Sequence, residues 1–257
     1  MKKLQPIKEP NAVAQDTWQS LKIYTAARIA LGRTGVAIPL KEVLAFKLAH
    51  AHARDAVYSE LKQEALISDL EQFQLPIYAL HSRATNRHEY LQRPDFGRQL
   101  SEISTKILHT AHAPASDIAL IIADGLSATA VNNHAIPLLK ILIPLLQQAN
   151  FKIAPLSIVH QGRVAIGDEI GFLGHAKFSV VLIGERPGLS SPDSMGAYLT
   201  YNPTVGLTDE SRNCVSNIRL EGLNYQSAAE KIFYLISESF RLQYSGVALK
   251  DNAGLLR

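Results

Sequence analysis

The second half of the chain alternates short, continuous apolar runs with longer segments whose apolar residues recur at helical spacing. The runs have the length of strands buried on both faces, and they read DIALIIADG (117–125), FKIAPLSIVHQGR (151–163) and FSVVLIGERPG (178–188). Helical patterns follow at 127–148, 167–174 and 224–246, and MGAYLTYNP (195–203) predicts a fourth strand. Strand–helix alternation requires right-handed crossovers. We therefore predict an α/β fold with a mostly parallel, doubly wound (Rossmann-like) sheet.

The first 110 residues show helical patterns and no predicted strand. Helices are expected over 16–32, 40–57 and 93–112, where apolar residues return about every 3.6 positions. Residues 1–16 carry two prolines and many polar groups, which is typical of a tail. The sequence thus predicts a flexible N-terminal arm (1–16), a helical N-terminal region (17–115) and an α/β domain (116–257). Within the 127–148 helix, Pro137 and Pro144 predict a break or kink.

Composition excludes several classes of protein. Hydrophobic residues make up 47% of the 257 positions and charged residues 19%, as in ordinary globular proteins. The net charge of +3 comes from scattered Lys and Arg, whereas a nucleic-acid binder usually gathers them into a stripe. The longest apolar stretch, 136–146, is shorter than the ~18 residues of a membrane span. A single cysteine and no secretion-signal pattern lead us to expect a cytoplasmic protein.

Polar residues and glycines follow each of the three predicted parallel strands. The first strand ends at Asp124, the second at 161–164 (QGRV), and the third at 184–188 (GERPG). Because the carboxyl ends of parallel strands lie along one edge of a sheet, these tips should meet in one ligand-binding crevice. An internal Glu185–Arg186 ion pair, or charges in a solvated loop, is the alternative interpretation. The tips contain no dinucleotide or phosphate-loop fingerprint.

The remaining chemical candidates are weaker. Cys214 is either a small core hydrophobe or, given its polar neighbours, part of a ligand-facing loop. His109 and His112 have the spacing to face one metal ion, but no cysteine or carboxylate is spaced to complete a site. No nucleophile–base pair stands out. From its residues alone, the chain is expected to bind a ligand, with no catalytic or metal-ligating residue assigned.

Several of these segments resemble the small, or light, subunit of ethanolamine ammonia-lyase. The segments that carry the resemblance are DGLSATAV (124–131), QGRVAIGDEIG (161–171), VLIGERPGLSSPDSMGAYLTY (181–201) and TDESRNCVSNIR (208–219). Upstream, TAARIALGRTG (25–35), LAHAHARDAV (48–57) and YLQRPDFGR (90–98) are similar in the same order. The resemblance runs from about residue 25 to residue 246 and covers nearly the whole chain.

This resemblance implies a partner and a cofactor. In the family, a TIM-barrel large subunit holds ethanolamine and the catalytic side chains, and adenosylcobalamin lies between the two subunits. A radical reaction then gives acetaldehyde and ammonia. The matching motifs imply cobalamin contacts at Val164, Glu185 and Cys214. Arg163 and Arg186 are secondary candidates, either for the phosphate of the cofactor's nucleotide or for pairing with Glu185.

The sequence departs from the family pattern at Thr34, Thr204 and Leu220, and only the change at Thr204 is expected to alter a loop near the cofactor. Some relatives have longer N-terminal tails, so packaging into a bacterial microcompartment stays open. The alternative function is a self-sufficient α/β module that binds a small phosphorylated or nucleotide ligand. Stabilisation of the isolated chain by nucleotides, but not by cobalamin, would favour that alternative.

Overall fold

The computed structural model describes residues 13–111 and 114–250, so most of the predicted 1–16 arm, and His112, lie outside the described residues. One six-stranded sheet organises the body, in the order β1-β3-β2-β4-β5-β6. The first four strands of that order run parallel, and β5 and β6 are antiparallel to their neighbours. The strands are β1 (Ile77–His81), β2 (Ser116–Ala123), β3 (Leu156–His160), β4 (Ala176–Gly184), β5 (Met195–Tyr201) and β6 (Arg212–Ile218). The predicted α/β fold with a mostly parallel sheet is confirmed.

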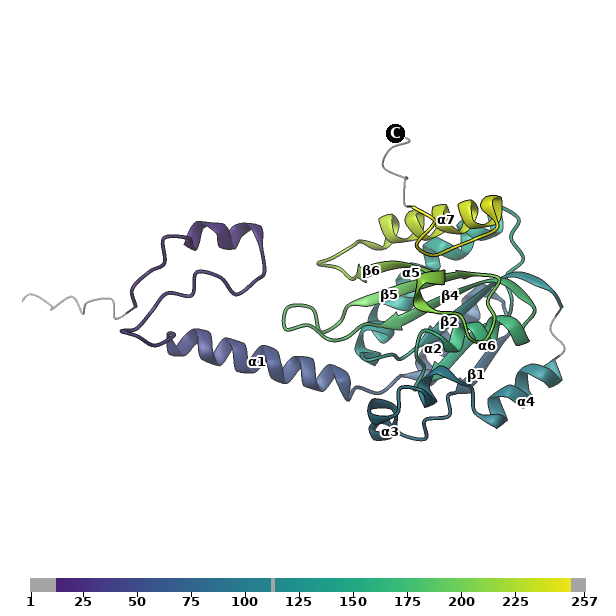
Figure 1. Ribbon diagram of the computed structural model, residues 1–257, viewed down its shortest axis with the longest axis horizontal. Helices are drawn as coiled ribbons and strands as arrows, with labels where there is room; N and C mark the ends of the chain where they lie inside the picture. The colour runs from purple at the N-terminus through teal and green to yellow at the C-terminus, as the bar shows by residue number, and fades with distance from the viewer. Residues whose placement is uncertain (1–12, 112–113, 251–257) are drawn as a thin grey trace, which may run out of the picture.

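Helices cover both faces of this sheet (Figure 1). One face packs against α2, α5 and α7, and the other against α4 and α6. The α-helices are α1 (Leu40–Val57), α2 (Gln63–Leu70), α3 (Arg87–Gln92), α4 (Glu102–Ala111), α5 (Ala128–Gln148), α6 (Ile166–Leu173) and α7 (Tyr225–Leu242). Short 3-10 helices are η1 (Gln19–Tyr24), η2 (Glu71–Phe73), η3 (Phe96–Arg98) and η4 (Asp209–Ser211).

Strand β2 shows why the apolar runs form central strands. Its side chains alternate between the two faces of the sheet: Ile118, Leu120 and Ile122 join the core under α5, whereas Ala119 and Ile121 join the core under α6. Both sets are almost fully buried. A strand covered on both faces needs apolar residues at every position, and the sequence supplies them.

Helix α5 is the central helix of the larger core. The Ser127 hydroxyl caps its N-terminus by accepting a hydrogen bond from the Ala130 amide. The helix continues through Pro137 and Pro144, so of the predicted break or kink the break is wrong and the kink stays a prediction. Among the described residues, α5 alone is long and apolar enough to cross a membrane by length and composition, and 56% of the tested window is buried inside the protein. Its apolar residues therefore serve the core.

Three N-terminal predictions need correction. The prediction of no strand before residue 110 is wrong, because β1 pairs with β3 at the sheet edge. It is short and only half-buried, so its pattern is weak. The 93–112 segment is not one helix: it divides into η3 and α4, because its middle turns into an isolated bridge between Ser82 and Leu100. The 16–32 segment forms only η1, while the helix at 40–57 is confirmed as α1.

The loop predicted around Cys214 is also wrong, since these residues form the edge strand β6, in which Cys214 pairs with Tyr198. The division of the chain at residue 116 stays a prediction, although β1 joins the sheet from before that point.

Residues 13–57 lie beside the body: they form a projecting segment that ends in α1 (Figure 1).

Candidate functional site

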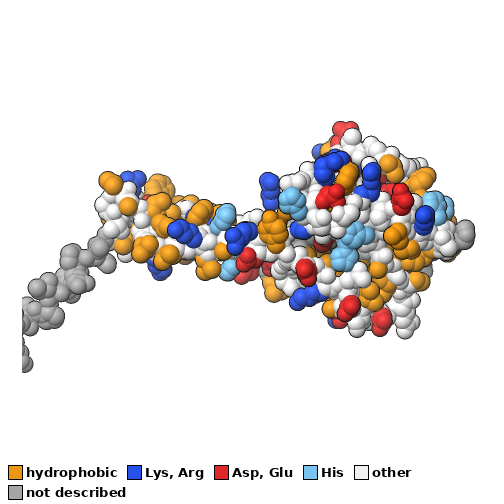
Figure 2. Space-filling view, turned by 90° about the horizontal axis from the view of Figure 1, so that it is seen from below, with side chains coloured by type: hydrophobic (Ala, Val, Ile, Leu, Met, Phe, Trp, Pro, Cys, Tyr) orange, Lys and Arg blue, Asp and Glu red, His pale blue; other side chains and the backbone are white. Residues whose placement is uncertain are grey.

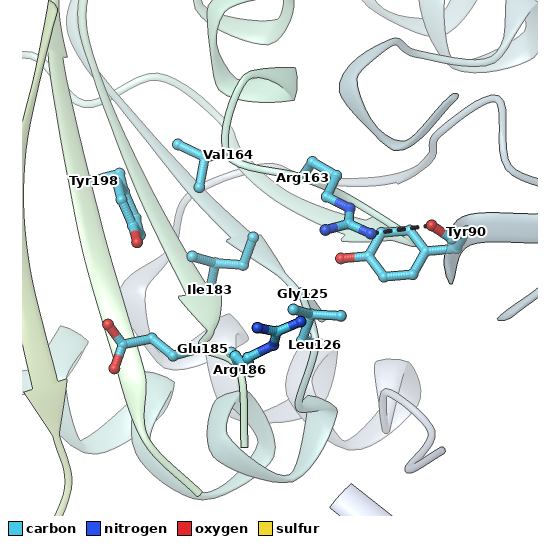
Figure 3. A pocket seen from close by; sticks show the side chains of 10 residues that line it. Tyr90, Gly125, Leu126, Arg163, Val164, Ile183, Glu185, Arg186 and Tyr198 are labelled. Atoms are coloured by element: carbon cyan, nitrogen blue, oxygen red, sulfur yellow. Dashed lines mark hydrogen bonds between the residues drawn. The ribbon is translucent and has the colours of Figure 1, made fainter. Parts of the chain in front are cut away.

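A pocket of about 460 Å³ opens where β2, β3 and β4 end (Figure 3). The expected convergence of the three strand tips is therefore present in the structure. The pocket is lined by Tyr90, Gly125, Leu126, Arg163, Val164, Ile183, Gly184, Glu185, Arg186 and Tyr198. Below, these residues are called the strand-tip pocket.

Two glycines let the strand tips approach one another closely. A Cβ on Gly184 would lie 2.0 Å from the Ser127 carbonyl oxygen, and one on Gly125 would lie 2.3 Å from the Gly184 carbonyl oxygen. Gly125 also adopts a positive φ of 59°, which side chains disfavour. The Leu126 amide donates to the Gly184 carbonyl at 2.9 Å and joins the β2 tip to the β4 tip. Any larger residue at either glycine would push the tips apart.

Asp124 fixes the second strand tip to the first. Its buried carboxylate accepts hydrogen bonds from the amides of Gln161 (2.8 Å) and Gly162 (3.0 Å). Burial raises the pKa of Asp124 to about 6, and these hydrogen bonds together with the charge of Arg87, 3.9 Å away, oppose that rise. Asp124 is not among the residues that line the strand-tip pocket, so it shapes the pocket from behind.

Glu185 is held by the antiparallel half of the sheet. Its carboxylate accepts hydrogen bonds from the hydroxyls of Ser194 and Ser216 and, at 3.2 Å, from the amide of Asn217. A carboxylate offers about four lone-pair positions. Two of the three donors bond Oε2 and one bonds Oε1, so Oε1 keeps one position for a ligand. Glu185 is thus a fixed acceptor in the pocket wall.

Glu185 and Arg186 do not form the ion pair that was the alternative interpretation. The two side chains point apart in Figure 3, and Arg186 makes no hydrogen bond or ion pair with any described residue. The other arginine of the pocket is anchored: Arg163 stacks on the Tyr90 ring at 4.3 Å and donates to the Tyr90 carbonyl at 3.1 Å. Its buried Nε has no hydrogen-bond partner in the described chain.

The three predicted cofactor contacts lie close to one another. Val164 and Glu185 are half-buried and line the same pocket. Cys214 is exposed on β6, directly across from Tyr198, whose ring lines the pocket. Partial burial raises the pKa of the Cys214 thiol, a hydrogen bond with Tyr198 opposes this, and the Glu185 charge adds to it. Their binding role stays a prediction.

A buried group on α5 positions the loop that carries Ser194. His134 lies 2.8 Å from the Tyr225 hydroxyl through Nδ1 and 3.3 Å from the Asp193 carboxylate through Nε2. The neighbouring Pro192 carbonyl accepts from the Ser127 hydroxyl at 2.8 Å. These bonds hold the loop next to Glu185. No spacing in the sequence indicates this arrangement, because its members lie on three separate elements.

Sequence reasoning also missed or misplaced other residues. Tyr90 and Tyr198 line the pocket, but isolated tyrosines in amphipathic segments look like core residues. Arg212, one of the polar neighbours of Cys214, does not face a ligand site: it is buried and donates to Asp168 at 2.6 Å and 2.8 Å. Among the described residues, no group of three or more His, Cys, Asp or Glu side chains could hold a metal ion.

The chain is similar to known proteins over nearly its whole length. A family model described as ethanolamine ammonia-lyase light chain matches residues 15–250. Proteins named ethanolamine ammonia-lyase small subunit are 51% identical to this chain in Pseudomonas fluorescens (strain Pf0-1), Ralstonia nicotianae and Azotobacter vinelandii. The first alignment covers 96% of this chain and 91% of the relative, the second 95% and 92%, and the third 95% and 91%.

Proposed function

Because this chain belongs to the ethanolamine ammonia-lyase light-chain family, we propose that its strand-tip pocket forms one wall of an adenosylcobalamin site that a larger subunit completes. Family membership makes the chain a small subunit of an ammonia-lyase enzyme, and that name implies a larger partner. In this proposal the partner is a TIM barrel that holds ethanolamine, and the reaction releases acetaldehyde and ammonia. The enzyme then acts in the cytoplasm, and its packaging into a microcompartment stays open.

The residues of the pocket fit one side of a corrin ring. A corrin is broad, flat and apolar on its faces, and primary amides surround its edge. Val164, Leu126 and Ile183 offer apolar surface, and Oε1 of Glu185 offers the unused acceptor position that an amide N–H needs. Cys214 adds a compact, polarizable side chain beyond Tyr198. The combination of apolar wall and fixed acceptor is the observation that supports the proposal most.

The two pocket arginines suit the phosphate of the cofactor's nucleotide. Arg186 has no partner in the described chain, and Arg163 is held in place by Tyr90 while its Nε lacks a hydrogen-bond acceptor. Arginine guanidinium groups bind phosphate with several donors at once. When bound, adenosylcobalamin supplies the radical chemistry that removes hydrogen from ethanolamine. The residues of this chain bind and orient the cofactor, and the catalytic side chains are assigned to the large subunit.

The same two arginines also favour the alternative function, in which the chain binds a small phosphorylated ligand without a partner.

A titration distinguishes these two functions. Adenosylcobalamin is added to this chain, to the large subunit, and to both together, and binding is followed by the cofactor's visible absorbance. We expect tight binding and ammonia release only with both subunits. Full binding and activity with the large subunit alone would contradict the proposal, and strong thermal stabilisation of the isolated chain by ATP would favour the alternative.

A further inference from the structure

The segment 13–57, here called the docking arm, makes little contact with the body of its own chain. It consists of η1, α1 and the chain between them, which is held by isolated β-bridges from Ala14 to Arg33 and from Thr34 to Ala37. It projects from one end of the body (Figure 1). Only Ala56, in the last turn of α1, is buried within that helix, and η1 contains no buried residue. The docking arm is therefore folded but lacks a core of its own.

The docking arm nevertheless carries more than half of the exposed large hydrophobic side chains in the described chain. Figure 2 shows hydrophobic side chains over its surface, with Lys and Arg between them. The most exposed are Leu40 (71%), Ile23 (78%), Tyr24 (81%) and Val36 (100%). Polar or small residues would be expected if this segment only extended into water. Concentrated exposed apolar surface of this kind marks an interaction site.

We propose that the docking arm binds the large subunit, at an apolar surface bordered by acidic side chains. The identity of this partner rests on the proposed function. The charge of the arm supports the choice: it contains six Lys and Arg residues but only three Asp and Glu residues. Pairing the arms of two copies of this chain would bring two positive segments together. An acidic, apolar surface on a different subunit removes that repulsion.

Two sets of contacts make the docking arm continuous with the strand-tip pocket. At its base, Arg87 donates to the Val57 carbonyl at 2.6 Å and to the Gly125 carbonyl in the pocket at 2.8 Å. Further along, Arg28 donates to the Leu189 carbonyl at 3.4 Å, in the loop that follows the pocket residues of β4. A large subunit that completes the pocket would therefore meet the docking arm as well.

The test removes apolar side chains from the docking arm of the full chain, co-produced with the large subunit. In the variant Ile23→Ser/Val36→Ser/Leu44→Ser, all three positions are exposed, at 78%, 100% and 55%. The free variant should therefore fold like the wild type, which its thermal unfolding midpoint checks. We expect its dissociation constant for the large subunit to rise about 100-fold or more, because buried apolar anchors dominate interface affinity.

A matched control removes three exposed apolar side chains from the body, in the variant Ile103→Ser/Phe172→Ser/Val247→Ser. It should bind the large subunit as the wild type does. Hydrogen exchange of the wild-type chain should show protection of residues 13–57 only when the large subunit is added.

Unchanged partner affinity in the arm variant would overturn the inference, and so would an arm that stays unprotected in the complex. Arm protection in the isolated chain, with a dimer mass in sedimentation, would overturn it in favour of a second copy. Adenosylcobalamin binding separates these failures from failure of the proposed function. If the arm variant binds the large subunit normally and the wild-type complex binds cofactor, only the docking inference fails. If the complex depends on the arm but binds no cofactor, only the cofactor assignment fails.

Discussion

Replacing Glu185 tests the pocket wall at its best-defined point. Its carboxylate accepts three hydrogen bonds, from the hydroxyls of Ser194 and Ser216 and from the Asn217 amide. Hydrogen bonds to a charged group contribute about 1.5–3 kcal/mol, and those between neutral groups about 1 kcal/mol. Glu185→Gln keeps the shape but removes the charge. If each bond loses roughly 0.7 kcal/mol of that difference, unfolding becomes easier by about 2 kcal/mol.

The same change should weaken cofactor binding. The remaining position on Oε1 would bond an amide of the corrin edge, and a neutral acceptor there should raise the dissociation constant roughly tenfold. Glu185→Ala leaves the buried Ser194 hydroxyl without its acceptor and should cost more, about 3 kcal/mol in stability and 1–3 kcal/mol in cofactor affinity.

Urea unfolding of the isolated chain gives the stability change, and absorbance titration of the assembled enzyme gives the cofactor dissociation constant. Glu71→Gln is the matched control, because Glu71 is exposed and distant from the pocket, and it should change neither quantity. A wild-type cofactor dissociation constant in both Glu185 variants would refute the acceptor role. An unchanged free energy of unfolding would refute the hydrogen-bond arrangement around the carboxylate.

Three further predictions concern the scaffold of the pocket. The pKa of Asp124 is raised to about 6 in the folded chain from about 3.9 when unfolded, so the folded state binds more protons between these values. The stability of the fold should therefore fall by about 2 kcal/mol as the pH rises from 4 to 7. Urea unfolding across that range should show this fall in the wild type relative to Asp124→Asn, and parallel pH profiles would contradict it. Gly184→Ala places a Cβ 2.0 Å from a carbonyl oxygen and should lower the free energy of unfolding by more than about 3 kcal/mol. The control Gly206→Ala, whose Cβ would have nothing within 4 Å, should lower it by about 1 kcal/mol in the same assay. Arg212→Met leaves the buried Asp168 carboxylate unpaired and should lower the free energy of unfolding by about 3–5 kcal/mol. The double variant Arg212→Met/Asp168→Leu should restore part of that loss. A double variant no more stable than the single one would argue against the ion pair.

The sequence predicted the centre of the sheet well, because β2 and β4 are apolar at nearly every position and only a doubly covered strand requires that. The rule for parallel strands then placed the tips of β2, β3 and β4 together, and the structure brings Val164 and Glu185 into one pocket. Local pattern was sufficient for these elements.

The edges of the sheet were not predictable in the same way. β1 and β6 are half-buried strands whose pairing depends on distant segments, so their local patterns resemble helix or loop. The environment of Glu185 depends on Ser194 and Ser216, which lie on different segments, and no spacing in the sequence connects them. The apolar spacing of α1 predicts a helix but not what its stripe contacts: Leu40, Leu44 and Leu48 are exposed, because the helix projects from the body.

A density map of this chain assembled with the large subunit and adenosylcobalamin would show whether the strand-tip pocket holds the cofactor. One face of the corrin is expected against Val164, an edge amide at Oε1 of Glu185, and Cys214 beside the ring, with the large subunit on the opposite side. A cofactor enclosed wholly by the large subunit, with the strand-tip pocket of this chain free of it, would refute the proposed role of the pocket.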